Sequence, residues 1–368
     1  MEIKKIVITG GPCAGKTTGL SYIEQELTKM GYKIVFINES ATELILNGLD
    51  RGANKTNLDY ESNIINLQVK KENLYMEYCK NLPYEKVLLI CDRGVMDCKS
   101  YMTDYEFDTA INQLGLDKIQ VRDNYDAVFH LVTAAKGAEH AYTLKNNQAR
   151  FESVEQAVKS DTKTMNAWTG HPHFRVIDNS TSFDLKMKRL VIEICSFLGI
   201  PKPLEVEKKF LIKKPDVVFL ENLENCQKVD IIQTYLNSKK DEEIRIRQRG
   251  ENGSYIFTLT RKKKTSSSTI RHETEKRISE KEYLTLLQNA NTKLHPIKKT
   301  RYCLIHNNRY FEIDVYPFAH LTAICEIELI NEHEKIDLPE FISLIKEVTS
   351  DKSYSNFSLS KKIPKDLI

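Results

Sequence analysis

A short stretch near the amino terminus has the residue types and spacing of a site that holds phosphate groups. Gly10-Gly11-Pro12-Cys13-Ala14-Gly15-Lys16-Thr17 fits the pattern G-x-x-x-x-G-K-[ST] and stands between an apolar run and an amphipathic segment. Glycines let the backbone wrap closely around phosphate oxygens, and the amino end of a helix adds positive potential. The pattern predicts a nucleoside triphosphate site, and the alternative is a glycine turn that carries a lysine by chance.

Within this stretch, Lys16 is expected to bridge the terminal phosphates and Thr17 to ligate Mg²⁺. Backbone N–H groups should converge on the phosphate oxygens. The residues expected to supply these contacts are Gly11, Cys13, Ala14, Gly15, Lys16, Thr17 and Thr18.

Other charged residues are expected near the phosphates. Asp92 ends an apolar run and would hold Mg²⁺ through water or accept a proton from an acceptor hydroxyl; the alternative is a surface Asp–Arg pair. Glu39 follows another such run, and it is either a site residue or a helix amino-terminal glutamate. Arg150 begins a predicted helix after a polar stretch and is the candidate lid cation, whereas Lys145 and Arg175 are read as solvated charges.

The second half of the chain carries charged residues at every other position of its strand-like runs. Arg245, Arg247 and Arg249 are separated by single residues, as are Glu326 and Glu328. Alternate residues of a strand share a face, so a barrel would gather these stripes into a tunnel. There, basic groups would grip phosphates, and carboxylates would hold Mg²⁺ or Mn²⁺. The alternative is an open sheet whose charged stripes face water.

Two patterns of secondary structure position these residues. The first half alternates short apolar strands with amphipathic helices, which predicts a parallel sheet covered on both faces. Its expected strands are Ile3–Thr9, Lys33–Ile37, Lys86–Cys91, Ala127–Val132 and Phe174–Ile177, and its expected helices include Thr17–Met30, Leu58–Cys79, Val154–Trp168 and Phe183–Leu198.

After a break at Gly199–Pro203 the pattern becomes many strands in series, which predicts an antiparallel sheet or barrel. Only Glu280–Asn289 and Pro339–Val348 are predicted helices there. The expected domains are therefore 1–198 and 204–368, joined by a linker at 199–203.

Composition narrows the functional classes. The chain has 368 residues, 41% of them hydrophobic, and a net charge of +3, which favours two globular domains and gives no general case for nucleic acid binding. The basic run Arg261–Lys264 is short and lacks interleaved aromatic residues. Eight irregularly spaced cysteines favour buried thiols. With no signal peptide and no membrane-length apolar run, a cytoplasmic location is expected.

The first half resembles the small P-loop kinase group that includes nicotinamide riboside kinases. The resemblance spans about residues 1–198. It rests on the phosphate loop and on Asn38–Ala41, Asp92–Gly94, Ala149–Glu152, Ala167-Trp168, Gly170–Pro172 and Ile177–Asn179. It implies a kinase-like core without fixing the acceptor.

The second half resembles the CYTH family of triphosphate tunnel metalloenzymes over about residues 203–360. Glu205-x-Glu207-x-Lys209 is that family's signature, and the remaining motifs follow in its order. The resemblance implies an eight-stranded tunnel. Its metal-side carboxylates would be Glu205, Glu207, Asp314, Glu326 and Glu328, and its phosphate contacts Lys209, Arg245, Arg247, Lys262, Lys299 and Arg301.

The pairing of both halves resembles the TRPL-translocation-defect proteins, which implies links to GTP and phosphoinositides. We therefore expect an Mg²⁺-dependent enzyme that hydrolyses ATP or GTP or transfers a phosphoryl group, with a tunnel that binds or hydrolyses triphosphate or polyphosphate. The alternative is a GTP-regulated binder of phosphoinositide or polyphosphate without tunnel catalysis. No guanine-reading Asn-Lys-x-Asp motif stands out, which leans the expectation towards ATP.

Overall fold

The computed structural model describes residues 1–139, 153–200, 206–239, 242–264, 271–329 and 336–368. The chain divides into two compact units, Met1–Leu204 and Glu205–Ile368. The predicted linker at 199–203 lies partly outside the described residues. Each unit is considered by itself below.

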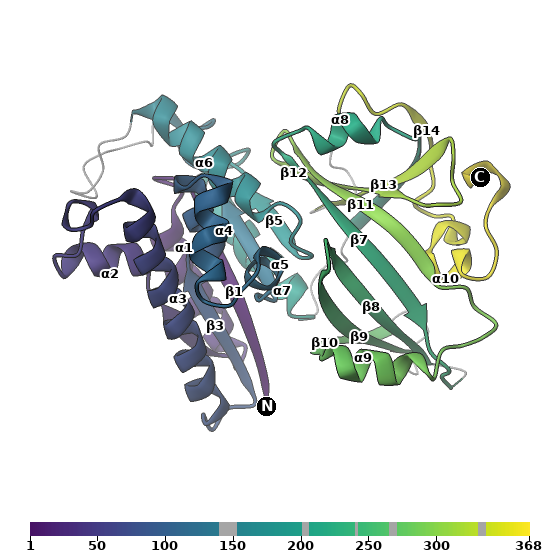
Figure 1. Cartoon of the computed structure of the whole chain (residues 1–368), viewed down its shortest axis with the longest axis horizontal. Helices are drawn as coiled ribbons and strands as arrows, with labels where there is room; N and C mark the ends of the chain where they lie inside the picture. The colour runs from purple at the N-terminus through teal and green to yellow at the C-terminus, as the bar shows by residue number, and fades with distance from the viewer. Residues whose placement is uncertain (140–152, 201–205, 240–241, 265–270, 330–335) are drawn as a thin grey trace. The chain divides into compact units, whose positions relative to one another are not determined.

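The first unit is built on a five-stranded parallel sheet in the order β2-β3-β1-β4-β5 (Figure 1). Its strands are β1 (Glu2–Gly10), β2 (Lys33–Ile37), β3 (Lys86–Asp92), β4 (Ala127–Leu131) and β5 (Phe174–Ile177). The central strands are almost entirely buried, as expected for a parallel sheet covered on both faces. Because the strands are parallel, β1 and β3 end at the same edge, where the phosphate loop begins.

Helices cover both faces of this sheet. The helices α1 (Lys16–Lys29) and α7 (Phe183–Phe197) bury Ile23, Leu27 and Leu190 in one core with the sheet. The helices α3 (Asn57–Lys80) and α6 (Val154–Trp168) contact the sheet elsewhere, α3 at β2 and β3 and α6 at β1. The remaining elements are α2 (Ser40–Leu46), η1 (Arg51–Ala53), η2 (Val95–Tyr101), α4 (Asp104–Asn112) and α5 (Lys118–Arg122).

The second unit is dominated by an antiparallel sheet in the order β10-β9-β8-β7-β11-β12-β13-β6-β14. Its strands are β6 (Val206–Lys213), β7 (Cys226–Tyr235), β8 (Glu242–Glu251), β9 (Ser254–Lys264), β10 (Arg271–Ile278), β11 (Ile297–His306), β12 (Arg309–Val315), β13 (Thr322–Leu329) and β14 (Leu344–Glu347). The predicted succession of a parallel and an antiparallel domain is confirmed.

The strand register gives this sheet one apolar and one charged face. On one side, Phe210, Tyr302 and Phe311 pack with Leu220 of α8 (Val217–Glu221), and Ile246 packs with Tyr283 of α9 (Glu280–Leu287). Directly opposed residues of antiparallel strands point to the same side. The register joins Lys209 to Glu326, Glu326 to Glu312, Arg301 to Asp314, and Arg247 to both Gln233 and Thr258. The predicted charged stripes therefore share a single face.

Two details of the second unit differ from the prediction. The sheet includes nine strands within the described ranges, because the short β14 adds to β6 beyond the eight expected. The predicted helix at Pro339–Val348 is wrong, since Leu344–Glu347 is that added strand. Its exposed residues offer no periodic pattern, and pairing with β6 decides the conformation.

The end of the charged face is covered by the carboxyl-terminal segment. Leu211 and Ile324 lie on that face and pack with Tyr354, Leu359 of α10 (Asn356–Leu359) and Leu367. Two short turns of 3₁₀-helix, η4 (Lys352–Tyr354) and η5 (Lys365–Leu367), complete the segment. At this end of the face the side chains are therefore apolar rather than charged.

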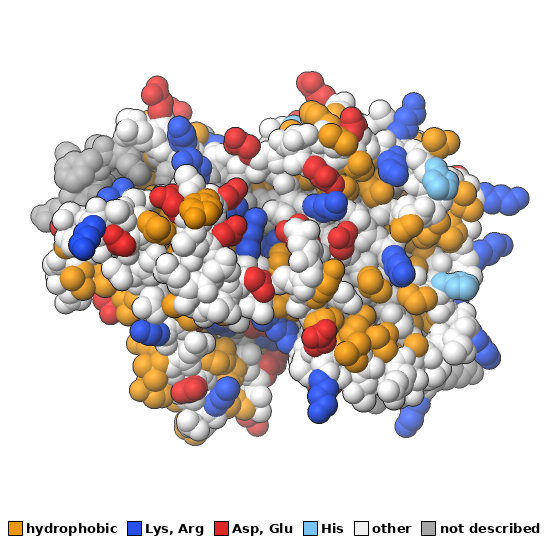
Figure 2. All heavy atoms as spheres, viewed as in Figure 1, with side chains coloured by type: hydrophobic (Ala, Val, Ile, Leu, Met, Phe, Trp, Pro, Cys, Tyr) orange, Lys and Arg blue, Asp and Glu red, His pale blue; other side chains and the backbone are white. Residues whose placement is uncertain are grey.

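All eight cysteines are reduced thiols outside any disulfide, as predicted, and six of them are buried. None of the helices within the described ranges combines the length and the apolar run that a membrane crossing requires. The face of the molecule in Figure 2 carries acidic and basic side chains interspersed, without a large field of one sign.

Candidate functional site: a phosphate loop and a charged strand face

The predicted phosphate loop joins the end of β1 to the start of α1. Gly15 adopts a φ of 92° as the residue before the helix, and Cys13 has a φ of 55°. A side chain at Gly10 would place its Cβ 2.1 Å from the carbonyl oxygen of Leu131, so the loop can pass β4 only as glycine. The backbone is thus wrapped tightly at the amino end of α1, where its N–H groups and the helix dipole favour an anion.

A buried carboxylate fastens the start of this loop. Asp161 of α6 accepts hydrogen bonds at Oδ1 from the backbone N–H groups of Gly11, at 2.9 Å, and Thr133, at 3.1 Å. The same oxygen lies 3.0 Å from Nε2 of His130 in β4. The Gly11 N–H is therefore already engaged, which departs from the prediction that it points to phosphate.

A buried lysine holds the loop from behind. Lys186 of α7 donates from Nζ to the carbonyl oxygens of Ala14, at 3.1 Å, and Val132, at 2.7 Å, and to Oδ1 of Asn179, at 2.7 Å. Burial lowers the pKa of Lys186 to about 8. The loop is thus tied both to the end of β4 and to the turn before α7.

Lys16 and Asp92 form the charged centre of the site. Burial lowers the pKa of Lys16, and Arg93 adds to the effect, while Asp92 and Glu39 oppose it. Burial raises the pKa of Asp92, and Lys16 opposes that shift. In the described ranges, no carboxylate forms an ion pair with the Lys16 ammonium, although Asp92, Glu39 and Asp97 act on its charge.

A second tier of ion pairs surrounds this centre. Arg93 donates from Nε to Glu39 Oε1, at 2.5 Å, and from Nη1 to Asp97 Oδ1, at 2.9 Å. Burial alone would raise the pKa of Glu39, but Arg93 and Lys16 hold it at about 2. Asp97 in turn accepts from the hydroxyl of Thr9 and from the indole N–H of Trp168, the latter at 3.1 Å. Glu39 is therefore an ionised carboxylate beside the loop.

The residues present fit one magnesium ion. Asp92 Oδ1 is buried and makes no hydrogen bond to the described part of the chain, so it is an acceptor that lacks a donor. Thr17 lies exposed at the second position of α1. A hydroxyl and a carboxylate that acts through water are the protein groups that Mg²⁺ takes in phosphate-loop proteins.

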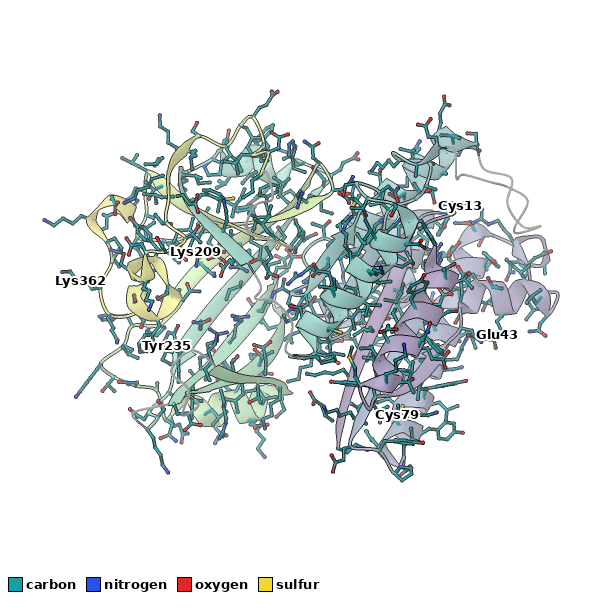
Figure 3. The ribbon with its side chains drawn as sticks, turned by 180° about the vertical axis from the view of Figure 1, so that it is seen from behind. Cys13, Glu43, Cys79, Lys209, Tyr235 and Lys362 are labelled. Carbon is teal, nitrogen blue, oxygen red and sulfur yellow. The ribbon has the colours of Figure 1, made fainter. Side chains whose placement is uncertain are left out.

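The predicted residues of the first unit are brought together except for one. The loop residues, Asp92 and Glu39 all meet at the end of β1 and β3, and Cys13 is labelled there in Figure 3. Arg150 lies outside the described residues. Arg175, which was predicted to be a solvated charge, is only partly exposed, and its Nε lies 3.6 Å from Glu193 Oε2.

The charged face of the second unit is organised around Arg301. This side chain donates from Nε and Nη2 to the two oxygens of Asp314, each at 2.7 Å, and from Nη2 to Glu326 Oε2, at 3.2 Å. It also pairs with Glu312, and Lys299 pairs with Asp314. Burial alone would raise the pKa of Asp314, but Arg301 and Lys299 hold it well below its usual range.

These pairs occupy some of the carboxylates that were predicted to hold a metal ion. Within the described ranges, no group of three or more His, Cys, Asp or Glu side chains is arranged to hold a metal ion. Asp314 and Glu326 are engaged by cations, with Lys209 Nζ 2.7 Å from Glu326. The same ammonium is 3.4 Å from Glu207 Oε1, and Glu207 and Glu328 are both exposed. Glu205 lies outside the described residues. The predicted role of these carboxylates as metal ligands therefore stays a prediction.

The predicted phosphate contacts lie on the same face. Lys209, Lys299 and Arg301 contact its carboxylates, while Arg247 donates from Nη2 to Gln233, at 3.3 Å. Its Nε is buried and has no hydrogen-bond partner within the described chain. Burial and the neighbouring Arg245 lower the pKa of Arg247. Arg245 and Lys262 share the face through register, and Figure 3 labels Lys209 and Tyr235 on this sheet.

Sequence reasoning missed Asp161, Lys186, Asp97 and the role of Arg93. A signal existed for Asp161, because it falls at helical spacing among the buried residues Ala157, Thr164 and Trp168. A carboxylate within the apolar stripe of a helix requires a buried partner. Lys186 carries the same signal, because it falls at helical spacing with the buried Leu190 and Ile194 of α7. Arg93 and Asp97 pair with each other four residues apart, but their contacts with Glu39 and Trp168 join distant parts of the chain.

Comparison with known protein families matches an AAA domain to residues 5–186 and a CYTH domain to residues 203–359. The chain carries an AAA domain followed by a CYTH domain. This is the expected fusion of a P-loop domain with a CYTH domain, in the expected order. Both assignments point to the binding or hydrolysis of nucleotides or triphosphates.

Several solved structures resemble part of the chain. The hypothetical protein NE1496 is 27% identical, with 44% of this chain and 100% of that chain covered at a TM-score of 0.33. A structure of the inorganic triphosphatase NE1496 is also 27% identical, and the match covers 44% of this chain and 98% of that chain at a TM-score of 0.31. A conserved hypothetical protein from Pyrococcus furiosus is 22% identical, and the match covers 35% of this chain and 80% of that chain at a TM-score of 0.26. Comparison with curated proteins gives no significant match.

Proposed function

We propose that the AAA domain binds Mg²⁺ with ATP or GTP and hydrolyses it or transfers its γ-phosphoryl group. The observation that supports this most is that the Lys16 ammonium and the buried Oδ1 of Asp92, which accepts no described hydrogen bond, act on each other's charge at the end of β1 and β3 without forming an ion pair. The Lys16 ammonium would contact a terminal phosphate, and the Asp92 carboxylate would accept a hydrogen bond from a water on Mg²⁺ or from an acceptor hydroxyl.

Each loop residue then has a role. Lys16 neutralises charge on the transferring group, and the N–H groups from Cys13 to Thr18 bind phosphate oxygens. Bound Mg²⁺, held by Thr17 and by Asp92 through water, would neutralise charge on the phosphates. Asp161 and Lys186 keep the loop in place, and Arg150 is proposed as the lid cation.

We further propose that the charged face of the CYTH domain binds triphosphate or polyphosphate. Arg247 would contact the phosphates first, because its guanidinium has an unsatisfied N–H, and Arg245 and Lys262 lie on the same face and would add further contacts. Lys209, Lys299 and Arg301 would follow when the anion competes with their carboxylate partners. Binding of a free polyphosphate is favoured over tunnel hydrolysis, since the described carboxylates do not form a metal site.

The second candidate is a regulatory protein that binds GTP and a phosphoinositide head group or other polyphosphate without tunnel catalysis. The cation-engaged Asp314 and Glu326 favour it for the second unit. Both candidates bind a nucleoside triphosphate and a polyphosphate, and they differ in whether the protein hydrolyses or transfers phosphate.

Phosphate release from ATP, GTP, inorganic triphosphate and pyrophosphate, with Mg²⁺ or Mn²⁺, tests the proposal. Lys16→Ala should abolish nucleotide hydrolysis by the intact chain, while Lys29→Ala, an exposed change on the same helix, should leave it unchanged. Glu207→Ala, with exposed Glu347→Ala as its control, should leave nucleotide turnover unchanged.

The outcomes separate the candidates. Triphosphate hydrolysis that survives Lys16→Ala and is lost with Glu207→Ala would establish catalysis in the second unit and contradict the binding role. Tight nucleotide binding without turnover of any substrate would favour the regulatory protein. Failure to bind either nucleotide would refute the proposal for the AAA domain.

A further inference from the structure

A buried ion pair lies inside the first unit, on the side of the sheet that faces away from α1 and α7. Ile6 and Ile8 of β1 share the core with those helices, so Lys5 points to the opposite side, because side chains alternate along a strand. There its Nζ lies 2.9 Å from Oε2 of Glu72 in α3. Lys5 is 5% exposed and Glu72 is 2% exposed. Replacement of such a pair by apolar side chains is often neutral or stabilising, so stability alone does not account for its presence.

The second oxygen of Glu72 links this pair to the neighbourhood of the phosphate site. Glu72 Oε1 accepts hydrogen bonds from the hydroxyl of Tyr125, at 2.7 Å, and from Nε2 of Gln68, at 2.9 Å. Burial raises the pKa of Tyr125 well above its ordinary value, so the hydroxyl remains a donor. Both side chains also contact the turn at residues 93–95, which directly follows Asp92.

Two backbone groups of the 93–95 turn are bound in this way. The backbone N–H of Val95 donates to the Tyr125 hydroxyl, at 3.0 Å, and Gln68 Nε2 donates to the carbonyl oxygen of Arg93, at 3.3 Å. Arg93 has a φ of 68°, a conformation that persists only where the surrounding structure enforces it. The side chains around Glu72 therefore supply part of the support that this turn requires.

Aromatic rings restrict the same turn. A side chain at Gly94 would place its Cβ 2.9 Å from the ring of Trp168 and 3.0 Å from Cζ of Tyr125. The two rings contact each other edge to face, with centroids 5.3 Å apart. The backbone N–H of Gly94 donates to Oδ2 of Asp97, at 3.0 Å. The chain consequently has little freedom after Asp92, and the direction of that carboxylate depends on the position of the turn.

The phosphate loop is held by other groups. Asp161 accepts from the backbone N–H of Gly11, and Lys186 donates to the carbonyl oxygen of Ala14. One set of contacts thus fixes the loop, and another fixes the turn that carries Asp92. A change at the second set should move Asp92 and leave the loop in place.

We propose that Glu72 is a positioning residue, which sets the direction of the Asp92 carboxylate by holding the 93–95 turn through Tyr125 and Gln68. The inference rests on the proposed hydrolysis or transfer of phosphate by the AAA domain. Asp92 would act on a water or a hydroxyl in the chemical step, so its displacement lowers kcat more than nucleotide affinity. A misplacement of about 1 Å at a reacting group can reduce the rate about 100-fold.

Two double variants isolate the oxygen that accepts from Tyr125 and Gln68. Lys5→Met with Glu72→Gln removes both buried charges and keeps an acceptor oxygen at position 72. Lys5→Met with Glu72→Met removes the same charges and leaves no such acceptor. Because neither variant strands a single buried charge, both are expected to fold.

A single substitution tests the contact nearest the turn. Tyr125→Phe deletes the oxygen that joins Glu72 to the turn and keeps the ring on Gly94. Its matched control is Tyr302→Phe, because the Tyr302 hydroxyl in the second unit donates to Glu221 in the same way, at 2.9 Å. For the full-length variants, ADP formation from ATP with Mg²⁺ gives kcat and KM. Titration with a fluorescent ATP analogue gives the affinity.

The two double variants should differ in kcat and agree in affinity. The variant with Gln at position 72 should stay within about threefold of the wild-type kcat, and the variant with Met should fall about tenfold or more. Tyr125→Phe should lower kcat about threefold or more, whereas Tyr302→Phe should not change it. KM and the affinity for the ATP analogue should stay within about twofold in all four proteins.

Hydrogen exchange measures the position of the turn without catalysis. In the variant with Met at position 72, peptides that contain Gly94 and Val95 should exchange faster than in the variant with Gln. Peptides of the phosphate loop should exchange equally in both. Trp168, the one tryptophan of the chain, should report the same difference in its fluorescence, because its ring lies against Gly94.

Three results would overturn the inference: equal kcat in the two double variants, a loss of ATP affinity in parallel with kcat, and equal exchange of the turn. A wild-type chain that forms no ADP would refute the proposed function by itself. In that case exchange decides the role of Glu72. Faster exchange of the turn alone in the Met variant would support it, and equal exchange would refute it.

Discussion

The two charged regions of the chain use the same chemical groups in opposite ways. In the AAA domain, Lys16 of the phosphate loop forms no ion pair with the described carboxylates, and buried residues such as Asp161 and Lys186 hold the backbone of the loop in place. In the CYTH domain, Arg301 and Lys299 are held by Asp314. The first region is arranged for an anion in advance, whereas the second must exchange internal partners to bind one.

The difference follows from how each fold supplies charge. A parallel sheet brings its loops to one edge, so the backbone N–H groups of one loop and a single lysine are enough to form an anion site. An antiparallel sheet presents side chains along whole strands, so many charges lie on one face and compensate each other. The backbone of a loop thus determines the arrangement of charge in one domain, and paired side chains determine it in the other.

The largest effect is expected from removing the centre of the network. Arg301→Ala leaves Asp314, Glu312 and Glu326 without their shared cation, and breaking such buried pairs costs about 3–5 kcal/mol. The free energy of unfolding, measured by urea titration, should fall by that amount, whereas Lys298→Ala, an exposed change on the same strand, should have little effect. A stable Arg301→Ala protein would mean that the network does not hold the fold together, and the contrast between the domains would fail.

A smaller effect is expected from loosening the loop. Asp161→Ala removes the acceptor shared by the N–H groups of Gly11 and Thr133, and a buried donor left unsatisfied costs about 1–3 kcal/mol. Part of that loss should appear as a weaker affinity for ATP in a fluorescence titration. Glu155→Ala, exposed on the same helix, serves as control. Unchanged ATP affinity would show that the loop is not positioned by α6.

The proposed anion site of the CYTH domain should show an effect of similar size. Arg247→Met removes the guanidinium whose Nε lacks a described partner, and a hydrogen bond to a charged group contributes about 1.5–3 kcal/mol. Affinity for inorganic triphosphate should fall about tenfold or more, with a weaker dependence on salt. Arg261→Met, an exposed cation on β9, is the control. Equal losses in both variants would indicate general attraction rather than a defined site.

The smallest effect is a pH dependence of stability from Lys186. Its pKa is about 8 in the folded chain, against about 10.4 in an unfolded one. Between these values the unfolded state binds more protons, so this residue makes the free energy of unfolding rise with pH, by at most about 1.4 kcal/mol per unit. Lys186→Met should reduce that slope between pH 8 and 10, whereas exposed Lys188→Met should not. A steeper slope in Lys186→Met would contradict the assignment.

Much of the fold follows from local sequence patterns. The strands Lys33–Ile37 and Phe174–Ile177 and the helix Val154–Trp168 have the predicted bounds, because apolar spacing and turn residues agree there. The alternating charges of the second half predicted a shared face, which the register confirms. Leu344–Glu347 could not be predicted, since a partner strand more than a hundred residues away determines its conformation.

The candidate site was predictable only where the backbone makes it. The phosphate loop is a contiguous motif, so its residues are named by sequence alone. The ties that hold it depend on tertiary contacts, such as those from Lys186 to Ala14 and Val132. For the same reason the sequence identified the charges of the CYTH face but not which of them pair with each other.

Arg93 has a left-handed backbone, with a φ of 68°, a conformation that glycine adopts at no steric penalty and other residues do not. Arg93→Gly should therefore relax the main chain while it deletes the side chain that joins Glu39 to Asp97. If the melting temperature of this variant is unchanged while its rate of nucleotide hydrolysis or phosphoryl transfer falls, the strained backbone at Arg93 is kept for the ion pairs that its side chain makes. Thermal stability and activity could then be changed separately at this one position.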